Sequence, residues 1–158
     1  MTRTALDTDR RKTKTVQDAL QLSVLLVEDS FLQQHVVVHL LKQLGHAVSI
    51  ASDGFEALSA VQQHSGFDVI LMDCHMPLMD GFEAARLIKN STSLNGSQIA
   101  IVGLSADALA EDCFSAGMDD FVRKPVNRQI LGAVLSRWSR QKRATHKEGY
   151  RHATCYTR

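Results

Sequence analysis

The sequence predicts an α/β fold in which five βα units form a doubly wound, five-stranded parallel sheet. Two observations lead to this prediction. Short apolar runs alternate with helical patterns five times along the chain, and all five runs end in or lead to polar groups. Connections between such strands are expected to be right-handed crossovers. The expected strands are Ser23–Glu28, His46–Ala51, Phe67–Asp73, Ile99–Leu104 and Asp119–Arg123.

The first helix has a clear start and a clear end. Ser30 is followed three residues later by Gln33, which is the spacing of a capping box, and Gly45 is expected to end the helix. Its apolar positions recur at helical spacing and are Leu32, Val36, Leu40 and Leu44.

The next two helices begin with the same four residues, Asp-Gly-Phe-Glu, at Asp53 and at Asp80. Shared N-cap chemistry explains this repeat better than a duplication, because Asp accepts backbone N–H bonds and Glu reaches back. A fourth helix is expected over Asp107–Ala116. The last helix is expected to start near Asn127, and one of its faces carries Ile130, Leu131, Val134, Leu135 and Trp138.

The chain is long enough for one domain with a substantial core, expected over residues 22–138. Flexible tails are expected at 1–21 and 139–158. The tails carry net charges of +2 and +5, whereas the middle carries −6. An acidic body makes a nucleic-acid partner unlikely, and the basic C-terminal run is more simply a solvated tail than a surface for nucleic acid or lipid.

Cysteine content and the N-terminus suggest a cytoplasmic protein. Cys74, Cys113 and Cys155 are an odd number without a CxxC pair, which fits reduced thiols, and Cys74 is expected to be buried. Residues 1–14 lack the apolar segment of a signal peptide, and no stretch is long and apolar enough to span a membrane.

Five polar side chains are expected to meet where the parallel strands end. Glu28, Asp29 and Asp73 supply carboxylates, Ser105 a hydroxyl and Lys124 an ammonium. Two unit charges about 4 Å apart repel by about 4 kcal/mol at an effective dielectric near 20, so three carboxylates need a cation or a proton. Magnesium prefers such oxygen ligands together with phosphate oxygens. Asp73 can then act as a nucleophile that forms an aspartyl-phosphate.

Each of these residues also has an ordinary structural explanation. Glu28 and Asp29 suit a helix start, Lys124 can be a solvated lysine before a turn proline, and Ser105 can be an N-cap. The occurrence of all these residues in one chain favours a magnesium and phosphate site over the separate structural explanations.

The combination resembles response-regulator receiver domains. The resemblance covers about residues 22–138, in which the motifs have the family's order and spacing. The residues within the motifs are most similar to those of receivers attached to hybrid sensor kinases. It rests on Glu28-Asp29, Asp73-x-x-Met76-Pro77-x-Met79-Asp80-Gly81, Ser105-Ala106, Ala116-Gly117-Met118-Asp119-Asp120-Phe121 and Lys124-Pro125. It implies a flavodoxin-like topology with strand order 2-1-3-4-5.

The resemblance implies that Asp73 accepts phosphate from a phosphohistidine. It also implies that Mg²⁺ is bound directly by Asp29, Asp73 and the backbone carbonyl of His75, and mainly through water by Glu28.

For the phosphoryl group, the implied ligands are Lys124, the Ser105 hydroxyl and the Ala106 backbone N–H. The Lys124–Pro125 bond is implied to be cis. Drawing Ser105 inward would give Phe121 space to move and would shift the face formed by the fourth helix, the fifth strand and the fifth helix, where the family usually meets its targets.

Two positions depart from the commonest family residues, since Ser105 replaces Thr and Phe121 stands where many members have Tyr. His75 and Asp107 flank the phosphate position and are expected to tune its lifetime.

The sequence therefore predicts a phosphoacceptor receiver in a two-component relay, a signalling switch rather than an enzyme with a separate substrate. Its expected partners are a histidine kinase or a histidine phosphotransfer protein, together with an unknown downstream protein and no membrane. One alternative is a receiver detached from a hybrid histidine kinase. A less favoured one is an aspartyl-phosphate phosphohydrolase, which typically needs a second Asp where this chain has His75. Two others, a degenerate receiver and a flavin- or nucleotide-binding protein of flavodoxin-like fold, fit the site residues poorly.

Overall fold

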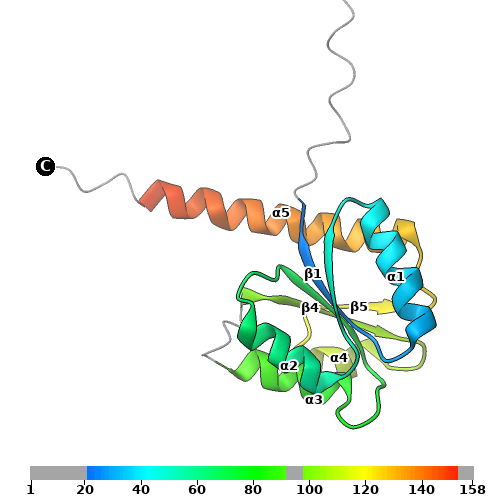
Figure 1. Cartoon of the computed structure of the whole chain (residues 1–158). Coiled ribbons are helices and arrows are strands. Elements are labelled where there is room, and N and C mark those ends of the chain that lie inside the picture. Colours follow the sequence, from blue (N-terminus) through cyan, green and yellow to red (C-terminus); the bar gives the residue numbers. More distant parts are fainter. Residues whose placement is uncertain (1–20, 92–97, 153–158) are drawn as a thin grey trace, which may run out of the picture.

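The computed structural model describes residues 21–91 and 98–152, with residues 142–152 described by their backbone alone. Five strands alternate with five helices in this part of the chain (Figure 1). In order they are β1 (Ser23–Val27), α1 (Phe31–Gln43), β2 (Ala47–Ala51), α2 (Gly54–Gln63), β3 (Val69–Asp73), α3 (Gly81–Asn90), β4 (Ala100–Ser105), α4 (Ala110–Ser115), β5 (Asp120–Arg123) and α5 (Arg128–His152).

The strands form one parallel sheet in the order β2-β1-β3-β4-β5, which confirms the predicted order. The order reverses between β1 and β3, so the connections leave from opposite faces of the sheet on the two sides of this point. In sheets of this kind, ligands bind beyond the carboxyl ends of the strands at the reversal. The end of β3, which is Asp73, lies there.

Alternate residues of the strands enter two separate cores. Leu25 and Ile70 belong to the core under α2 and α3, whereas Leu26 and Leu71 belong to the core under α1 and α5. Figure 1 shows these helix groups on opposite faces of the sheet. All five residues of β3 are buried, as expected for a central strand covered on both faces.

The first helix begins as predicted, because the Ser30 hydroxyl accepts the Gln33 backbone N–H at 3.4 Å. Its buried face differs from the apolar positions chosen from the sequence. Leu32 and Val36 are 74% and 48% exposed. The residues that α1 buries are Gln34, Val37 and Leu41. Gln34 can be buried because its amide donates to the Glu28 carbonyl at 2.7 Å.

The fourth helix starts later than predicted, at Ala110 rather than Asp107. The Ser105 hydroxyl accepts the backbone N–H groups of Asp107 and Ala108 at 3.2 and 2.9 Å. These bonds hold the chain in a turn at the end of β4, so helical geometry begins only after the turn.

The last helix is longer than predicted. It starts after Asn127, whose side chain accepts the Ile130 N–H at 2.9 Å, and Trp138 packs half-buried against the core under α1 and α5. The helix does not end near Trp138, where a flexible tail was expected, but continues to His152 (Figure 1). The predicted N-terminal tail, apart from Gln21, lies outside the described residues, as do residues 153–158. Among the described helices, none is long and apolar enough to cross a membrane.

Candidate functional site

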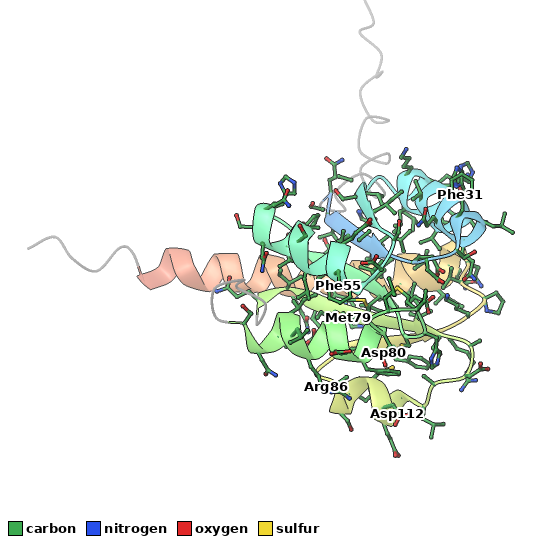
Figure 2. All side chains as sticks on the ribbon, turned by 60° about the horizontal axis from the view of Figure 1, so that its bottom comes forward. Phe31, Phe55, Met79, Asp80, Arg86 and Asp112 are labelled. Atoms are coloured by element: carbon green, nitrogen blue, oxygen red, sulfur yellow. The ribbon has the colours of Figure 1, made fainter. Side chains whose placement is uncertain are left out.

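Four of the predicted site residues lie at or directly after the carboxyl ends of their strands. Glu28 follows β1, Asp73 ends β3, Ser105 ends β4 and Lys124 follows β5. Because the strands are parallel, all four lie at the same edge of the sheet, as predicted. Figure 2 shows the side chains from the end of the molecule that carries Asp80 and Phe31, which lie in the segments that begin α3 and α1.

Glu28 is completely buried, and both of its carboxylate oxygens have partners. One oxygen accepts the Ser30 backbone N–H at 3.1 Å, and the other accepts the Lys124 ammonium at 2.8 Å. Burial raises the pKa of the Glu28 carboxyl, and the charge of Asp73 raises it as well, against the opposing effect of Lys124. Lys124 therefore opposes the effect of burial on this carboxyl.

Lys124 connects the fifth strand to the carboxylates across the sheet. Its ammonium lies 2.8 Å from Glu28 Oε2 and 3.2 Å from Asp73 Oδ2. Burial acts to lower the pKa of Lys124, but the hydrogen bond to Glu28 and the negative charges of Asp73 and Glu28 outweigh it and raise the pKa. The lysine is thus held as a cation. The Lys124–Pro125 bond is cis, as the resemblance implied.

Asp73 is nearly buried, and its side chain is only 7% exposed. Oδ1 accepts the His75 backbone N–H at 3.2 Å, and Oδ2 faces Lys124. The backbone behind Asp73 is fixed as well, because Gly81 at the start of α3 donates its N–H to the Cys74 carbonyl at 3.0 Å. The structure therefore presents one aspartate oxygen beside a cation on a rigid support.

Three carboxylates form a group that suits a hard metal ion. Glu28, Asp29 and Asp73 each offer an oxygen within 4.8 Å of the others. Asp29 is exposed, so the group opens to solvent on one side. Lys124 offsets only one of three negative charges, and oxygen donors of this kind are preferred by Mg²⁺ and Ca²⁺. The donor set therefore fits the metal that the sequence predicts.

His75 follows Asp73 by two residues, and its side chain is exposed. Its ring packs edge-on against Phe82, with 5.9 Å between the ring centroids. Two other residues with expected roles, Ala106 and Asp107, are also exposed and follow the end of β4.

Ser105 is buried, and its hydroxyl oxygen accepts the two N–H groups of the turn after β4. A serine hydroxyl also has one O–H donor, which these two bonds do not use. Phe121 is half-buried and packs against the core under α2 and α3. Ser105 on β4 and Phe121 on β5 lie on adjacent strands.

Two residues of the site were not recognised from the sequence. Gln33 Oε1 accepts the Lys124 ammonium at 2.8 Å, although Gln33 was interpreted only as part of a capping box. Gln34 connects α1 to the Glu28 carbonyl. Their position in the first turn after the acidic pair was the only available signal.

Behind Asp73, Cys74 is buried as predicted, and its sulfur lies 3.7 Å from that of Cys113. Burial raises the pKa of both thiols, which makes them poor nucleophiles. They belong to the core rather than to the site.

A comparison with known families matches residues 24–136 to the response regulator receiver domain. Among curated proteins, the chain is 34% identical to hybrid signal transduction histidine kinase A of Dictyostelium discoideum over 87% of its own length. It is 41% identical to hybrid signal transduction histidine kinase F of the same organism over 73% of its length. The chain spans only 7% and 11% of these two kinases.

Solved structures agree with this family. The receiver domain of sensor histidine kinase PA1611 from Pseudomonas aeruginosa, which has a magnesium ion coordinated in its active site cleft, is 38% identical with a TM-score of 0.69. The match covers 75% of this chain and 98% of that one. The receiver domain of Ssk1 from Saccharomyces cerevisiae, crystallised with the histidine phosphotransfer protein Ypd1, is 27% identical with a TM-score of 0.71, covering 77% and 91% of the two chains.

Proposed function

The chain belongs to the family of response regulator receiver domains, and we propose that it is a phosphoacceptor in a two-component relay. In this proposal Asp73 takes a phosphoryl group from a phosphohistidine of a partner. The P–N bond of the donor breaks, a P–O bond to the Asp73 carboxylate forms, and the released imidazole takes up a proton. The observation that carries the proposal is the contact of the Lys124 ammonium with Asp73 Oδ2 at 3.2 Å, beside two further carboxylates.

The protein groups stabilise charge and fix geometry during this transfer. Lys124 holds one phosphoryl oxygen as a point charge, and the Ser105 hydroxyl and the Ala106 backbone N–H bind others. Such preorganised donors are usually the largest single contribution to phosphoryl transfer. The buried carboxylate of Glu28 keeps the ammonium in place while the phosphoryl group arrives.

A magnesium ion bound by the carboxylates would neutralise charge on the incoming phosphoryl oxygens. Asp29, Asp73 and the His75 carbonyl are the proposed direct ligands, with Glu28 acting mainly through water. Asp29 is exposed and can reach an ion directly, whereas Glu28 is completely buried and bonded to Lys124 at 2.8 Å, which suits an indirect role. The magnesium ion in the Pseudomonas aeruginosa receiver domain supports the choice of metal.

Phosphorylation would act as a switch through Ser105 and Phe121. The Ser105 hydroxyl would turn toward the phosphoryl group, and the half-buried Phe121 would move into the space beside it. The turn that Ser105 now holds at residues 107 and 108 would change with it. This would alter the surface of α4, β5 and α5, which we propose as the surface for a downstream protein. Asp107, exposed in that turn, would influence attack by water.

The phosphodonor is proposed to be a histidine kinase or a histidine phosphotransfer protein in the cytoplasm. The yeast complex of a receiver domain with Ypd1 supports this class of partner. Exposed apolar side chains surround the site at the start of α1 and in the loop after β3, and they suit a protein partner. They are Phe31, Leu32 and Leu78. Because the chain spans a small part of its curated relatives, a receiver within a larger hybrid kinase is the alternative context.

The proposal is tested by mixing the protein with Mg²⁺ and a small acyl phosphodonor. We expect one phosphoryl group per chain, released by hydroxylamine as an acyl phosphate is, and no labelling after Mg²⁺ is removed with EDTA. Asp73→Asn should abolish labelling. Asp53→Asn is the matched control, because Asp53 caps α2 outside the site, and it should label normally. Equal labelling of Asp73→Asn, or none of the unaltered protein, would refute the proposal.

A further inference from the structure

Lys124 has a third partner that plays no part in the proposed transfer so far. We propose that Gln33 is a positioning residue for this site, whose side-chain amide fixes the direction of the Lys124 ammonium before the phosphoryl group arrives. This inference rests on the proposed function. It differs from the capping role inferred for Gln33 from the sequence.

The geometry gives the lysine a complete set of acceptors. A lysine ammonium has three N–H donors and accepts no bonds. Three oxygens surround Lys124 Nζ, namely Glu28 Oε2 at 2.8 Å, Gln33 Oε1 at 2.8 Å and Asp73 Oδ2 at 3.2 Å. Two contacts are short and one is longer. The longer one is the contact with the phosphoacceptor.

The longer distance from Lys124 Nζ to Asp73 Oδ2 has a consequence for phosphoryl transfer. When a phosphoryl group forms on Asp73, one of its oxygens can replace Asp73 Oδ2 as the third acceptor. The contacts with Glu28 and Gln33 can remain as they are. The ammonium therefore needs little reorganisation, which is the condition for effective electrostatic stabilisation. Lysine has a long stem with several rotatable bonds, so two fixed acceptors remove much of its conformational freedom in advance.

Gln33 is held where it can perform this role. Its backbone N–H is bound by the Ser30 hydroxyl at 3.4 Å. The next residue, Gln34, ties the same helical turn to the end of β1 through its bond to the Glu28 carbonyl. The helical turn that carries Gln33 is thus attached to the end of β1, which is followed by Glu28. As a result, the two acceptors Gln33 and Glu28 keep their positions relative to each other.

The chemistry of an amide also suits the position. Three carboxylates already lie within 4.8 Å of one another, so a fourth acid would add negative charge where an anionic phosphoryl group must enter. A neutral amide oxygen accepts from the ammonium without that repulsion. The charge of Lys124 stays available to the phosphoryl group.

The experiment replaces the acceptor and keeps the side-chain length, using Gln33→Met in the full chain. The rate constant for labelling Asp73 from a small acyl phosphodonor at saturating Mg²⁺ should fall about 3- to 10-fold, as expected for one partly exposed hydrogen bond to a charged group. The Mg²⁺ dissociation constant should stay unchanged. Gln43→Met is the matched control, because Gln43 is exposed on the same helix and bonds only to His39 among the described residues, and it should label normally.

A second measurement follows the lysine itself. In protein carrying ¹⁵N-lysine, the Lys124 ammonium signal should be protected from exchange with water, and Gln33→Met should increase that exchange. Gln33→Glu keeps an acceptor oxygen and should retain the protection.

The possible results separate this inference from the proposed function. Unchanged or faster labelling by Gln33→Met, or slower labelling with weaker Mg²⁺ binding, would overturn the positioning role. Unprotected Lys124 in the unaltered protein would do the same. A chain that does not label at all would overturn the proposed function, while the exchange measurement would still decide whether Gln33 holds the lysine.

Discussion

The helices α2 and α3 begin with the same four residues, Asp-Gly-Phe-Glu, but only α3 begins directly against the end of β3, which carries Asp73. Both aspartates, Asp53 and Asp80, accept the N–H of the glutamate three residues later at 2.8 Å. The local chemistry is therefore the same. The difference lies in what each glycine and each phenylalanine meets in the folded molecule.

The two glycines are close to different kinds of neighbour. A Cβ on Gly81 would press against the backbone carbonyl oxygen of Asp73 and lie 2.9 Å from the Cα of Cys74. A Cβ on Gly54 would lie 2.7 to 3.0 Å from side-chain atoms of Met79. A methionine side chain can rotate away, whereas the backbone at the end of β3 cannot move without moving Asp73. The same sequence thus has a flexible neighbour in one helix and a rigid one in the other.

The largest expected effect comes from Gly81→Ala. Overpacking against backbone should destabilise the fold by about 3 kcal/mol or more, and it should displace Asp73 so that labelling from a small phosphodonor is lost. The matching change, Gly54→Ala, should reduce the free energy of unfolding by only about 1 kcal/mol, because Met79 can repack and Ala is the better helix former. Urea unfolding and labelling of both variants measure this difference. Equal losses would show that the two helix starts are equivalent.

Replacing the two phenylalanines should give the next largest difference in the free energy of unfolding. Phe82 packs against the core under α2 and α3 and contacts the His75 ring, whereas Phe55 is 57% exposed. Phe82→Ala should therefore reduce the free energy of unfolding by about 2 kcal/mol, a part of the loss for a fully buried phenylalanine. Phe55→Ala should lose less than about 1 kcal/mol. A larger loss in Phe55→Ala, measured by urea unfolding, would contradict this order.

The aspartate caps should give effects of equal size. Asp53→Ala and Asp80→Ala each remove one side-chain acceptor at 2.8 Å from a helix start, so each should lose about 1 kcal/mol of stability. Thermal unfolding of the two variants checks the equality. Unequal losses would mean that the caps differ despite their matching geometry.

The two glutamates should each have a smaller effect on stability than the caps. Glu56 reaches back to the residue before the cap, because its carboxylate accepts the Ser52 backbone N–H at 2.7 Å. Within the described residues, no such bond from the chain before α3 reaches the Glu83 carboxylate. Glu56→Ala should therefore reduce the free energy of unfolding by about 0.5 kcal/mol more than Glu83→Ala. A thermal unfolding comparison in which Glu83→Ala loses more would reverse the assignment.

Much of the fold and the site could be predicted because the signals are local. Apolar runs mark the strands, and polar residues at their ends mark the edge where Asp73 and Lys124 meet. The caps at Ser30, Asp53 and Asp80 follow from residue type and spacing. Parallel strands then bring distant residues together without further information.

The features that were missed depend on tertiary contacts. The contact of Gln33 with Lys124 joins residues 91 positions apart, and the place of Gln33 just after the acidic pair does not by itself reveal that contact. Leu32 and Val36, which mark the helical spacing of α1, are exposed, whereas a glutamine, Gln34, is buried and satisfied by a backbone carbonyl. The late start of α4 follows from the two bonds to the Ser105 hydroxyl.

The length of α5 was missed for a different reason. Beyond Trp138 the helix has almost no apolar residues, so it lacks the periodic pattern from which helices are predicted. Its backbone nevertheless continues to His152, away from the sheet (Figure 1).

The length of that extension has a geometric consequence for any tilt of α5. The part after Trp138, Ser139–His152, is about 20 Å long at the usual rise per residue of a helix. Its base is joined to β5 through Arg137 and Asp120, whose charged groups lie 3.2 Å apart. A tilt of about 10° at this joint would move the far end by about 4 Å over such a helical length. A change of angle at the fifth strand would thus produce a larger displacement at the far end of α5 than at its base.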